Sequence, residues 1–467
     1  MDQSDGRPDE SLASMTRTAR LTQWAAALSY DEIPSAVIEQ TKLLFLDWLG
    51  CCVAGRSHAS VQSMLHFAQT MGPKEGRSEL VSFAGVTTSP YFAAMVNGAS
   101  SHVVEQDDLH NSSMIHPATV VFPAALAVAQ DVGCSGSDFL KACVIGYEFA
   151  CRAGECLGKE HYKAFHSTAT AGVLGAAAAT TCLLKGTSPV YLSALGTAGT
   201  QAAGLWQFLL DATHSKQVHT ARACSNGVYA AYVATCGLLG PTDIIEGEKG
   251  MIAMLSARNA RPEFLDSKLG QKWAVMESSF KWHASCRHTH AAIDAFLALI
   301  EEFSIGWGDI EQVKAYTYDL AISIMSLSEK AETVHQSKFS MGFVLAVAAK
   351  HGQAMITDFT EQALEDTELR DFQRRVEMVL DAEIDSLFPE HWTSRIEVTT
   401  KTGSVFSKSV DAAKGDPQWS LTRDEIETKF RALVEYGGEK NMDFVDEIIN
   451  KVRRLETEAD IHGFAFV

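Results

Sequence analysis

Residues 35–54 read SAVIEQTKLLFLDWLGCCVA, and this stretch indicates the fold class. Side chains suited to a core recur three or four residues apart along it; they are Val37, Ile38, Thr41, Leu44, Phe45, Trp48 and Leu49. That spacing places them on one face of a helix. We therefore expect a long helix that buries this face against other helices.

Helical patterns extend from about residue 17 to residue 260. Segments rich in alanine and glycine predict further helices at 89–104, 117–131, 137–156, 167–184, 189–203 and 219–237. Small side chains let neighbouring helices approach each other closely. The first half of the chain is therefore predicted to be a packed helical domain.

The pattern changes near residue 270. Residues 310–318 alternate apolar and polar side chains like a half-buried strand, and 395–410 resembles a hairpin with its turn at 401–404. Helices are expected around these strands at 290–303, 337–350 and 368–381. Strands and helices mixed in this order predict a small α+β domain.

The C-terminal segment returns to a helical pattern. Thr422 and Glu425 form a capping box, which predicts a helix at 423–436. We therefore predict a mainly α protein with three parts. These are a disordered tail at 1–15, a discontinuous helical domain at 16–269 and 411–467, and an inserted α+β lid domain at 270–410.

The composition limits the possible partners. The 467 residues are 46% hydrophobic and 21% charged, as in a soluble globular protein with a large core. A formal net charge of −19 argues against binding nucleic acid or an anionic membrane. No apolar run reaches transmembrane length, residues 1–15 lack a secretory signal, and the ten cysteines form no Cys-x-x-Cys motif. We expect a cytoplasmic protein with reduced thiols.

Polar side chains are concentrated in residues 105–117, which read EQDDLHNSSMIHP and directly precede an apolar segment. Charged groups beside core-forming sequence are costly unless they are paired or used in function. One interpretation is an active site in which a carboxylate and His116 face the substrate. The alternative is a solvated acidic loop that caps the next helix.

Two more polar clusters adjoin predicted helices. His166 precedes an alanine-rich helix, whose N-terminus favours anions and lowers the pKa of a nearby histidine; helix capping is the alternative role for this cluster. Lys216, His219 and Arg222 are three residues apart and share one face if the segment is helical. Such a face suits a substrate that carries carboxylates, although basic patches are common.

Residues 281–290 read KWHASCRHTH and form the densest cluster. Cysteine and histidine at short spacing can bind a metal, but the spacing matches no structural zinc pattern. We therefore predict no metal and expect a helix start whose polar side chains point into a shared cleft. Motifs for nucleotide binding, serine hydrolysis and His-Glu-x-x-His zinc sites are absent, which favours acid–base chemistry without an organic cofactor.

Taken in order along the chain, these segments resemble the MmgE/PrpD family. The resemblance spans nearly the whole chain and rests on LLFLDWLG at 43–50, the segment 107–117, His166 before GVLGAAA at 172–178, SKQVH at 215–219 with 226–227, the segment 280–290, and GDP at 415–417 before 421–426. It implies a large helical domain with a smaller α+β lid and an active site between them. It also implies a homodimer and no cofactor.

The resemblance also assigns roles to residues. It implies catalytic positions at His116, His166, Lys216 and Lys281, and contacts with the substrate at Glu105, Asp108, His219, Cys286 and Arg287. Glu105 falls where decarboxylase-type members carry an aspartate, and Cys286 falls where the animal decarboxylases carry a lid histidine. The loop before His116 is one residue longer than in that pattern.

The shared first step of the family is removal of a proton α to a carboxylate, with the carbanion stabilised by cations such as Lys216, Lys281 and Arg287. The departures at Glu105 and Cys286 favour an epimerase of the iminodisuccinate type. A hydro-lyase of the 2-methylcitrate dehydratase type and a decarboxylase of the cis-aconitate type are alternatives. An inactive carboxylate-binding protein is the alternative from another class.

Overall fold

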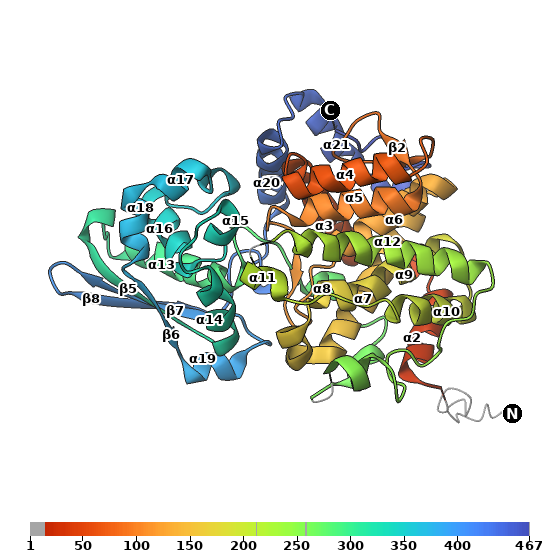
Figure 1. Cartoon of the computed structure of the whole chain (residues 1–467), viewed down its shortest axis with the longest axis horizontal. Coiled ribbons are helices and arrows are strands. Elements are labelled where there is room, and N and C mark those ends of the chain that lie inside the picture. Colours follow the sequence, from red (N-terminus) through yellow and green to blue (C-terminus); the bar gives the residue numbers. More distant parts are fainter. Residues whose placement is uncertain (1–14, 212, 257–258, 467) are drawn as a thin grey trace, which may run out of the picture.

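Two lobes make up the structure: a helical lobe and a smaller lobe that contains a four-stranded sheet (Figure 1). The computed structural model describes residues 15–211, 213–256 and 259–466. The prediction of a mainly α fold with a smaller α+β part is confirmed. The domain boundaries at 270 and 410 stay a prediction, and the predicted tail lies outside the described residues except for Met15.

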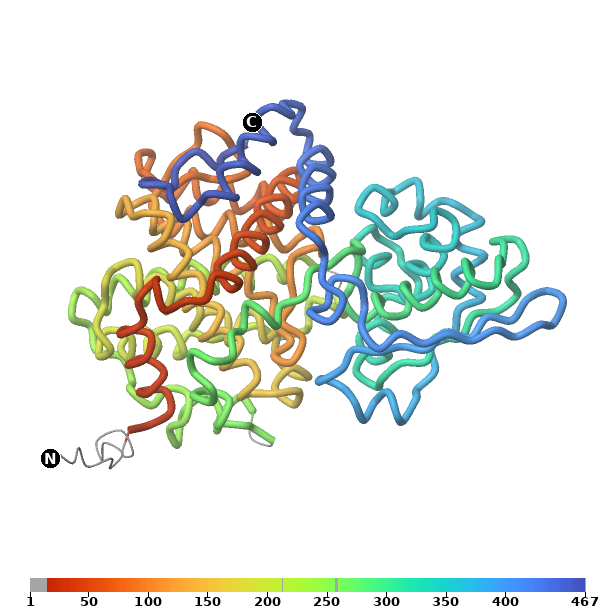
Figure 2. The backbone as a smooth tube through the Cα atoms, turned by 180° about the vertical axis from the view of Figure 1, so that it is seen from behind, coloured from red at the N-terminus to blue at the C-terminus, as the bar shows by residue number. Residues whose placement is uncertain are grey.

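The helical lobe is formed by segments from both ends of the chain. Its helices are α2 (Arg17–Ala27), α3 (Ser35–Gly55), α4 (Ala59–Met71), α5 (Pro90–His102), α6 (Ala118–Val132), α7 (Gly136–Ala164), α8 (Ser167–Thr170), α9 (Gly172–Leu183), α10 (Ser188–Gly199), α11 (Gln207–Asp211), α12 (Ser215–Thr235), α20 (Arg423–Tyr436) and α21 (Met442–Arg453). Figure 2 shows the C-terminal helices returning to this lobe, where α20 packs along α3. The helix expected from residues 35–54 is therefore present and central.

Close helix packing depends on glycine at several crossings. A Cβ atom added at Gly175 in α9 would lie 2.6 Å from the carbonyl oxygen of Gly146 in α7 and 2.7 Å from the Cβ of Ala150. These distances are shorter than any normal carbon contact, so α7 and α9 can approach this closely only because position 175 has no side chain. The small residues of the sequence thus perform the packing role expected of them.

The smaller lobe holds a mixed sheet covered by helices. Its strands are β5 (Ile310–Thr317), β6 (Val376–Leu380), β7 (Ser394–Thr400) and β8 (Val405–Val410). Their order is β6-β5-β7-β8, with β5 parallel to β6 and antiparallel to β7. The helices of this lobe are α13 (His290–Glu302), α14 (Asp319–Met325), α15 (Val334–Ser337), α16 (Met341–His351), α17 (Glu361–Glu365), α18 (Thr367–Gln373) and α19 (Ala382–Leu387).

One predicted helix of this lobe is wrong. Residues 368–381 were expected to be helical throughout, but α18 ends at Gln373 and β6 begins at Val376. The conformation of this segment is decided by the parallel pairing of β6 with β5. In this pairing Val376 lies opposite Val313, which is 63 residues away in the sequence. Local periodicity cannot report a pairing of that kind, because the partner is distant in sequence. The predicted strand, the hairpin and the helix at 423–436 are all present.

Two short strands bring the polar cluster at 105–117 close to the polar cluster at 281–290. β3 (Leu109–His110) pairs antiparallel with β4 (Ser278–Ser279), with Leu109 opposite Ser279. This pairing carries the 105–117 segment to the start of the 281–290 cluster. All ten cysteines are free. Among the described residues, none of the helices is both long and apolar enough to span a bilayer.

We predict that Gly175→Ala destabilises the protein. The added methyl group has no room between α7 and α9, and overpacking of this kind costs about 1–3 kcal/mol. Urea denaturation followed by circular dichroism measures the loss. Gly308→Ala is the control, because a Cβ there meets no atom within 4 Å. Equal midpoints for the two variants would show that the α7–α9 contact relaxes without cost.

Candidate active site

A small cavity lies between the two lobes, and it is lined by polar and aromatic side chains from both. The lining residues are Glu105, Leu109, His116, Tyr162, His166, Trp206, Lys216, Lys281, Cys286, Arg287, His288, Ile324, Phe339 and Trp392. They come from elements as distant as the end of α5 and the loop before β7. The fold therefore gathers four separate polar clusters of the sequence around one space.

Glu105 is the charged centre of this site. It lies in the turn after α5 with a φ of 60°, a left-handed conformation that is uncommon for a residue with a side chain. Its carboxylate forms an ion pair with Lys216, and Lys281 Nζ lies 3.5 Å from its Oε2 atom. All three side chains are buried, at 1% exposure for Glu105 and Lys281 and 4% for Lys216.

Three lysines hold the backbone on either side of Glu105. Lys338 donates to the carbonyl oxygen of Val104 at 2.9 Å and Lys281 to that of Glu105 at 3.2 Å. Lys429, from α20, donates to the carbonyl oxygen of Gln106 at 2.8 Å. Buried carbonyl groups need such partners when the backbone cannot pair regularly.

The buried charges shift the pKa values of this turn. Burial opposes ionisation of Glu105, but Lys216 and Lys281 outweigh that effect and hold its pKa well below the usual value. Burial lowers the pKa of Lys338 to about 8, although Glu105 acts in the opposite direction. Glu105 is therefore a carboxylate at neutral pH.

His116 presents one ring nitrogen to the cavity. Its Nδ1 atom lies 2.6 Å from the carbonyl oxygen of Asp108 and 3.4 Å from Asp107 Oδ2. A carbonyl oxygen only accepts hydrogen bonds, so Nδ1 carries the proton and Nε2 of the neutral ring carries the lone pair. Burial lowers the pKa of His116 well below its usual value, despite the opposing charge of Asp107.

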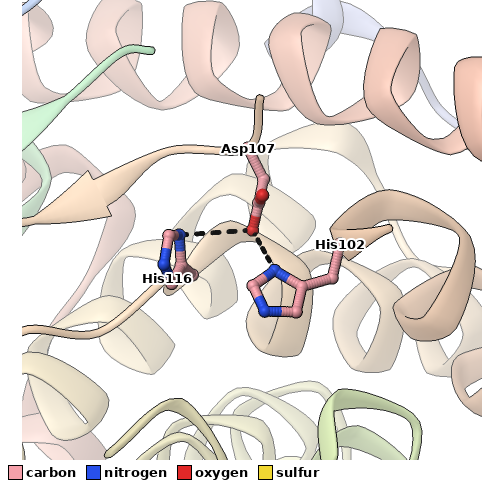
Figure 3. A group of neighbouring side chains, drawn as sticks. All are labelled: His102, Asp107 and His116. Atoms are coloured by element: carbon pink, nitrogen blue, oxygen red, sulfur yellow. Dashed lines mark hydrogen bonds and ion pairs between the residues drawn. The ribbon is translucent and has the colours of Figure 1, made fainter. Parts of the chain in front are cut away.

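Asp107 lies between two histidines, as Figure 3 shows. Its Oδ2 atom accepts a hydrogen bond of 2.6 Å from His102 Nδ1 and faces His116 Nδ1 on the other side. Burial alone would raise the pKa of Asp107. The two histidines and the hydrogen bond from His102 outweigh this effect and lower the pKa to about 2. Asp107 is therefore a negatively charged carboxylate that orients both imidazole rings.

His166 lies on another wall of the cavity, where it is the N-cap residue of α8. Its ring centroid lies 5.0 Å from that of Trp206, and its Nδ1 atom lies 3.3 Å from His219 Nδ1. Burial lowers its pKa well below the usual value, and the charges of His102 and Lys216 add to this effect. His166 is thus a second neutral imidazole in the cavity.

The segment 286–288 and the smaller lobe supply a cation, a thiol and an aromatic wall. Arg287 forms a buried ion pair with Asp416. Burial raises the pKa of the Cys286 thiol to about 11, so it is not a thiolate at neutral pH. His288 bonds the hydroxyl of Tyr318 through Nδ1 at 2.6 Å, and its ring stacks on Trp392 with centroids 4.8 Å apart.

Most of the residues expected at the site do line the cavity. These are Glu105, His116, His166, Lys216, Lys281, Cys286 and Arg287. His219 lies behind His166 instead, and Asp108 accepts from the backbone of Ala118 at 3.0 Å and from Tyr147 Oη at 2.8 Å. The chemical roles of all these residues stay predictions.

Several residues of the site were not expected from the sequence. Asp107 was noticed only within the polar segment 105–117 and His288 only within the cluster 281–290, whereas His102, Lys338, Trp206 and Trp392 were given no role at the site. The density of polar residues in 105–117 and 281–290 was the signal for Asp107 and His288. The others are isolated polar or aromatic residues whose neighbours come from distant segments.

Two groups of the described residues have the donor types of a metal site: His102, Asp107 and His116, and also His110, Glu155 and Glu277. In the first group, Nδ1 of His116 donates to a carbonyl oxygen, so Nε2 is its nitrogen with a free lone pair, and Asp107 Oδ2 already accepts a hydrogen bond from His102. In the second, Lys272 Nζ lies 2.8 Å from Glu277 and 3.5 Å from Glu155. The Lys272 ammonium group therefore already supplies the positive charge that a metal ion would bring to these carboxylates.

Comparison with known proteins identifies relatives of this chain. The MmgE/PrpD N-terminal domain matches residues 19–263 and the MmgE/PrpD C-terminal domain matches residues 283–455. A cis-aconitate decarboxylase-like protein of Aspergillus oryzae is 29% identical, with 95% of each chain covered. The cis-aconitate decarboxylase of Aspergillus terreus is 26% identical, covering 97% of this chain and 96% of its own, and that of Homo sapiens is 25% identical, covering 93% and 90%.

We predict that Glu105→Gln destabilises the protein by about 3–5 kcal/mol at pH 7, because two buried ammonium groups lose their counter-charge. Because the pKa of Glu105 is lower in the folded state, its carboxylate contributes its full stabilisation above the unfolded-state pKa of about 4.3. This stabilisation decreases as the pH falls toward the folded-state pKa. The contribution of the Glu105 carboxylate to the difference between parent and variant therefore narrows below about pH 4.3.

Chemical denaturation at a series of pH values measures this difference. Glu160→Gln is the matched control, because Glu160 pairs with the exposed Lys163. Its effect should be within about 0.5 kcal/mol of the parent. A Glu105→Gln variant as stable as the control would contradict the assignment of Glu105 as the counter-charge of both lysines.

Proposed function

The chain belongs to the MmgE/PrpD family, and from that premise we propose that it is a cofactor-independent lyase that decarboxylates a small unsaturated tricarboxylate such as cis-aconitate. The names of its relatives favour a lyase over the epimerase expected from the sequence. Those relatives are 25–29% identical to this chain over most of its length. The substrate itself is part of the proposal.

One observation carries the proposal: Lys216 and Lys281 converge in a closed cavity beside two neutral imidazoles. An ammonium group has three N–H donors, so each lysine that bonds Glu105 can also bond a substrate carboxylate. Arg287 adds a third cation. This arrangement suits an anionic substrate whose reaction places further negative charge on carbon.

In the proposed reaction, the bond between a substrate carbon and one carboxylate breaks and CO2 leaves. The electron pair stays on the carbon skeleton, where the lysines stabilise it, and a proton adds to carbon. The tricarboxylate trianion and one proton thus give a dicarboxylate dianion and CO2. His116 or His166 delivers the proton, because binding of an anionic substrate raises the pKa of a buried imidazole.

The cavity must open before a substrate can enter. Its volume is about 30 Å³, which is room for about one water molecule. The lining residues Ile324 and Trp392 belong to the smaller lobe, whereas His116 and Lys216 belong to the helical lobe. Separation of the two sides admits the substrate, and closure excludes water from the reacting carbon.

Epimerisation is the second candidate, and the pair of neutral histidines favours it. His116 precedes α6 and His166 precedes α8, so the two imidazoles reach the cavity from different elements. One base can remove a proton α to a carboxylate while the conjugate acid of the other returns one. This reaction consumes no net proton, which separates it experimentally from decarboxylation.

The test uses the purified enzyme with cis-aconitate, citrate, methylcitrate and iminodisuccinate, in deuterium oxide and in weakly buffered water. Release of CO2 with uptake of one proton per turnover supports the proposal. Interconversion of iminodisuccinate stereoisomers with deuterium at Cα would support the epimerase instead, and loss of water would support a hydro-lyase. Binding of these acids without any turnover would support an inactive carboxylate-binding protein.

We predict that Lys281→Met lowers kcat/KM by about 100-fold or more, because a donor that stabilises developing negative charge is lost. Steady-state assays of CO2 release measure the effect. Lys163→Met is the control, since the Lys163 side chain is 52% exposed and lies outside the cavity lining. A Lys281→Met variant that keeps the parental kcat/KM would remove Lys281 from the mechanism.

The expected homodimer is also part of the proposal. Gel filtration with mass detection tests it, because the chain has a mass of 50.7 kDa. A single species near that mass would contradict a dimer.

A further inference from the structure

His219 lies between the active-site cavity and a second hollow of the helical lobe. This hollow is an open groove of about 430 Å³ beside α11 and α12, and it shares no lining residue with the cavity. His219 lines the groove three residues after Lys216, which lines the cavity. One turn of α12 thus carries a residue that lines the cavity and a residue that lines the groove.

A hydrogen bond joins the two spaces. The Nδ1 atoms of His166 and His219 lie 3.3 Å apart, and His166 lines the cavity while His219 lines the groove. One of the two rings must donate and the other accept, because both atoms are ring nitrogens. This hydrogen bond therefore connects the cavity with the groove through two imidazole rings.

The surroundings hold the two rings in contact. The backbone N–H of His166 donates to the carbonyl oxygen of Gly204 at 2.8 Å, and Phe208 packs edge-on against His219 with ring centroids 5.4 Å apart. Gly204 has a φ of 154°, and an added Cβ would lie 3.4 Å from His219 Nδ1 and 2.8 Å from Ala169 Cβ. A larger residue there would crowd the pair.

We propose that His219 relays protons between the groove and His166, so that the closed site can be recharged from solvent while it holds the substrate. The inference rests on the proposed function, because decarboxylation consumes one proton in each turnover. Without a path of this kind, a closed cavity would have to open before its acid could be restored.

The proton balance of the relay is simple. His166 Nε2–H gives its proton to the substrate carbon as CO2 leaves. In the same concerted step, Nδ1 of His166 takes the proton from Nδ1 of His219, and Nε2 of His219 takes a proton from the groove, so that neither ring becomes an imidazolate anion. A change of tautomer in both rings restores the starting state, and the net change is one proton moved from groove to product.

The charge around His219 suits this role. Burial lowers its pKa to about 4, and His102, Lys216 and Arg222 act in the same direction. A neutral imidazole has one donor and one acceptor nitrogen, and a relay needs both. An imidazolium fixed in place would donate from both nitrogens and could not accept from the groove.

The test compares His219→Ala with the parent enzyme on the substrate identified in the panel. We expect kcat to fall by about tenfold or more, as on loss of an acid–base group, while KM changes by less than about threefold. Added imidazole should restore kcat in proportion to its concentration, because the groove is open to a small base. Gln207→Ala, which lines the same groove and bonds only Asp211 among the described residues, should keep the parental kcat and show no response.

A folded His219→Ala variant with the parental kcat would overturn the relay. A loss of kcat that imidazole and methylimidazoles fail to restore would also overturn it, because a purely packing role predicts that result. If the parent turns over none of the acids, the proposed function has failed, and the relay is then judged by a measurement without substrate.

That measurement is nitrogen NMR of enzyme labelled with ¹⁵N-histidine. The shared Nδ1 proton predicts that His219→Ala shifts the ring nitrogens of His166, whose signals are assigned by their loss in His166→Gln. Ring signals of His166 that are the same with and without His219 would overturn the hydrogen-bonded pair, whatever the substrate.

Discussion

The active site depends on a single unfavourable turn. Glu105 adopts a left-handed conformation with its charge in the protein interior, and each feature alone would cost free energy. Lys216 and Lys281 neutralise the carboxylate, while Lys281, Lys338 and Lys429 satisfy three consecutive carbonyl groups. The lysines come from four distant segments, so the turn is stable only when both lobes are folded.

This arrangement also sets the electrostatic character of the cavity. The Glu105 carboxylate is the counter-charge of two buried lysines. Burial lowers the pKa of the nearby His116, and Lys281 and Lys216 act in the same direction. The cavity thus combines cations that pair with one buried carboxylate and imidazoles that burial keeps neutral.

The sequence could predict the features that depend on nearby residues. The helices at 35–55 and 423–436 and the hairpin at 395–410 follow from periodicity, a capping box and turn chemistry. Polar clusters beside apolar helices marked most of the cavity lining, and the family resemblance ordered them. β6 and the roles of Lys338 and Lys429 were out of reach, because each depends on a contact between segments far apart in the chain.

The contact of Lys429 with the turn has a consequence for biosynthesis. Lys429 forms an ion pair of 2.6 Å with the buried Asp47 and also holds Gln106. A ribosome therefore synthesises the cavity-lining histidines and both cavity-lining lysines before the helix that completes their support. Until α20 arrives, the nascent chain carries an uncompensated carboxylate in its central helix. A product that lacks α20 would therefore leave Asp47 without its ion-pair partner and the carbonyl oxygen of Gln106 without its donor.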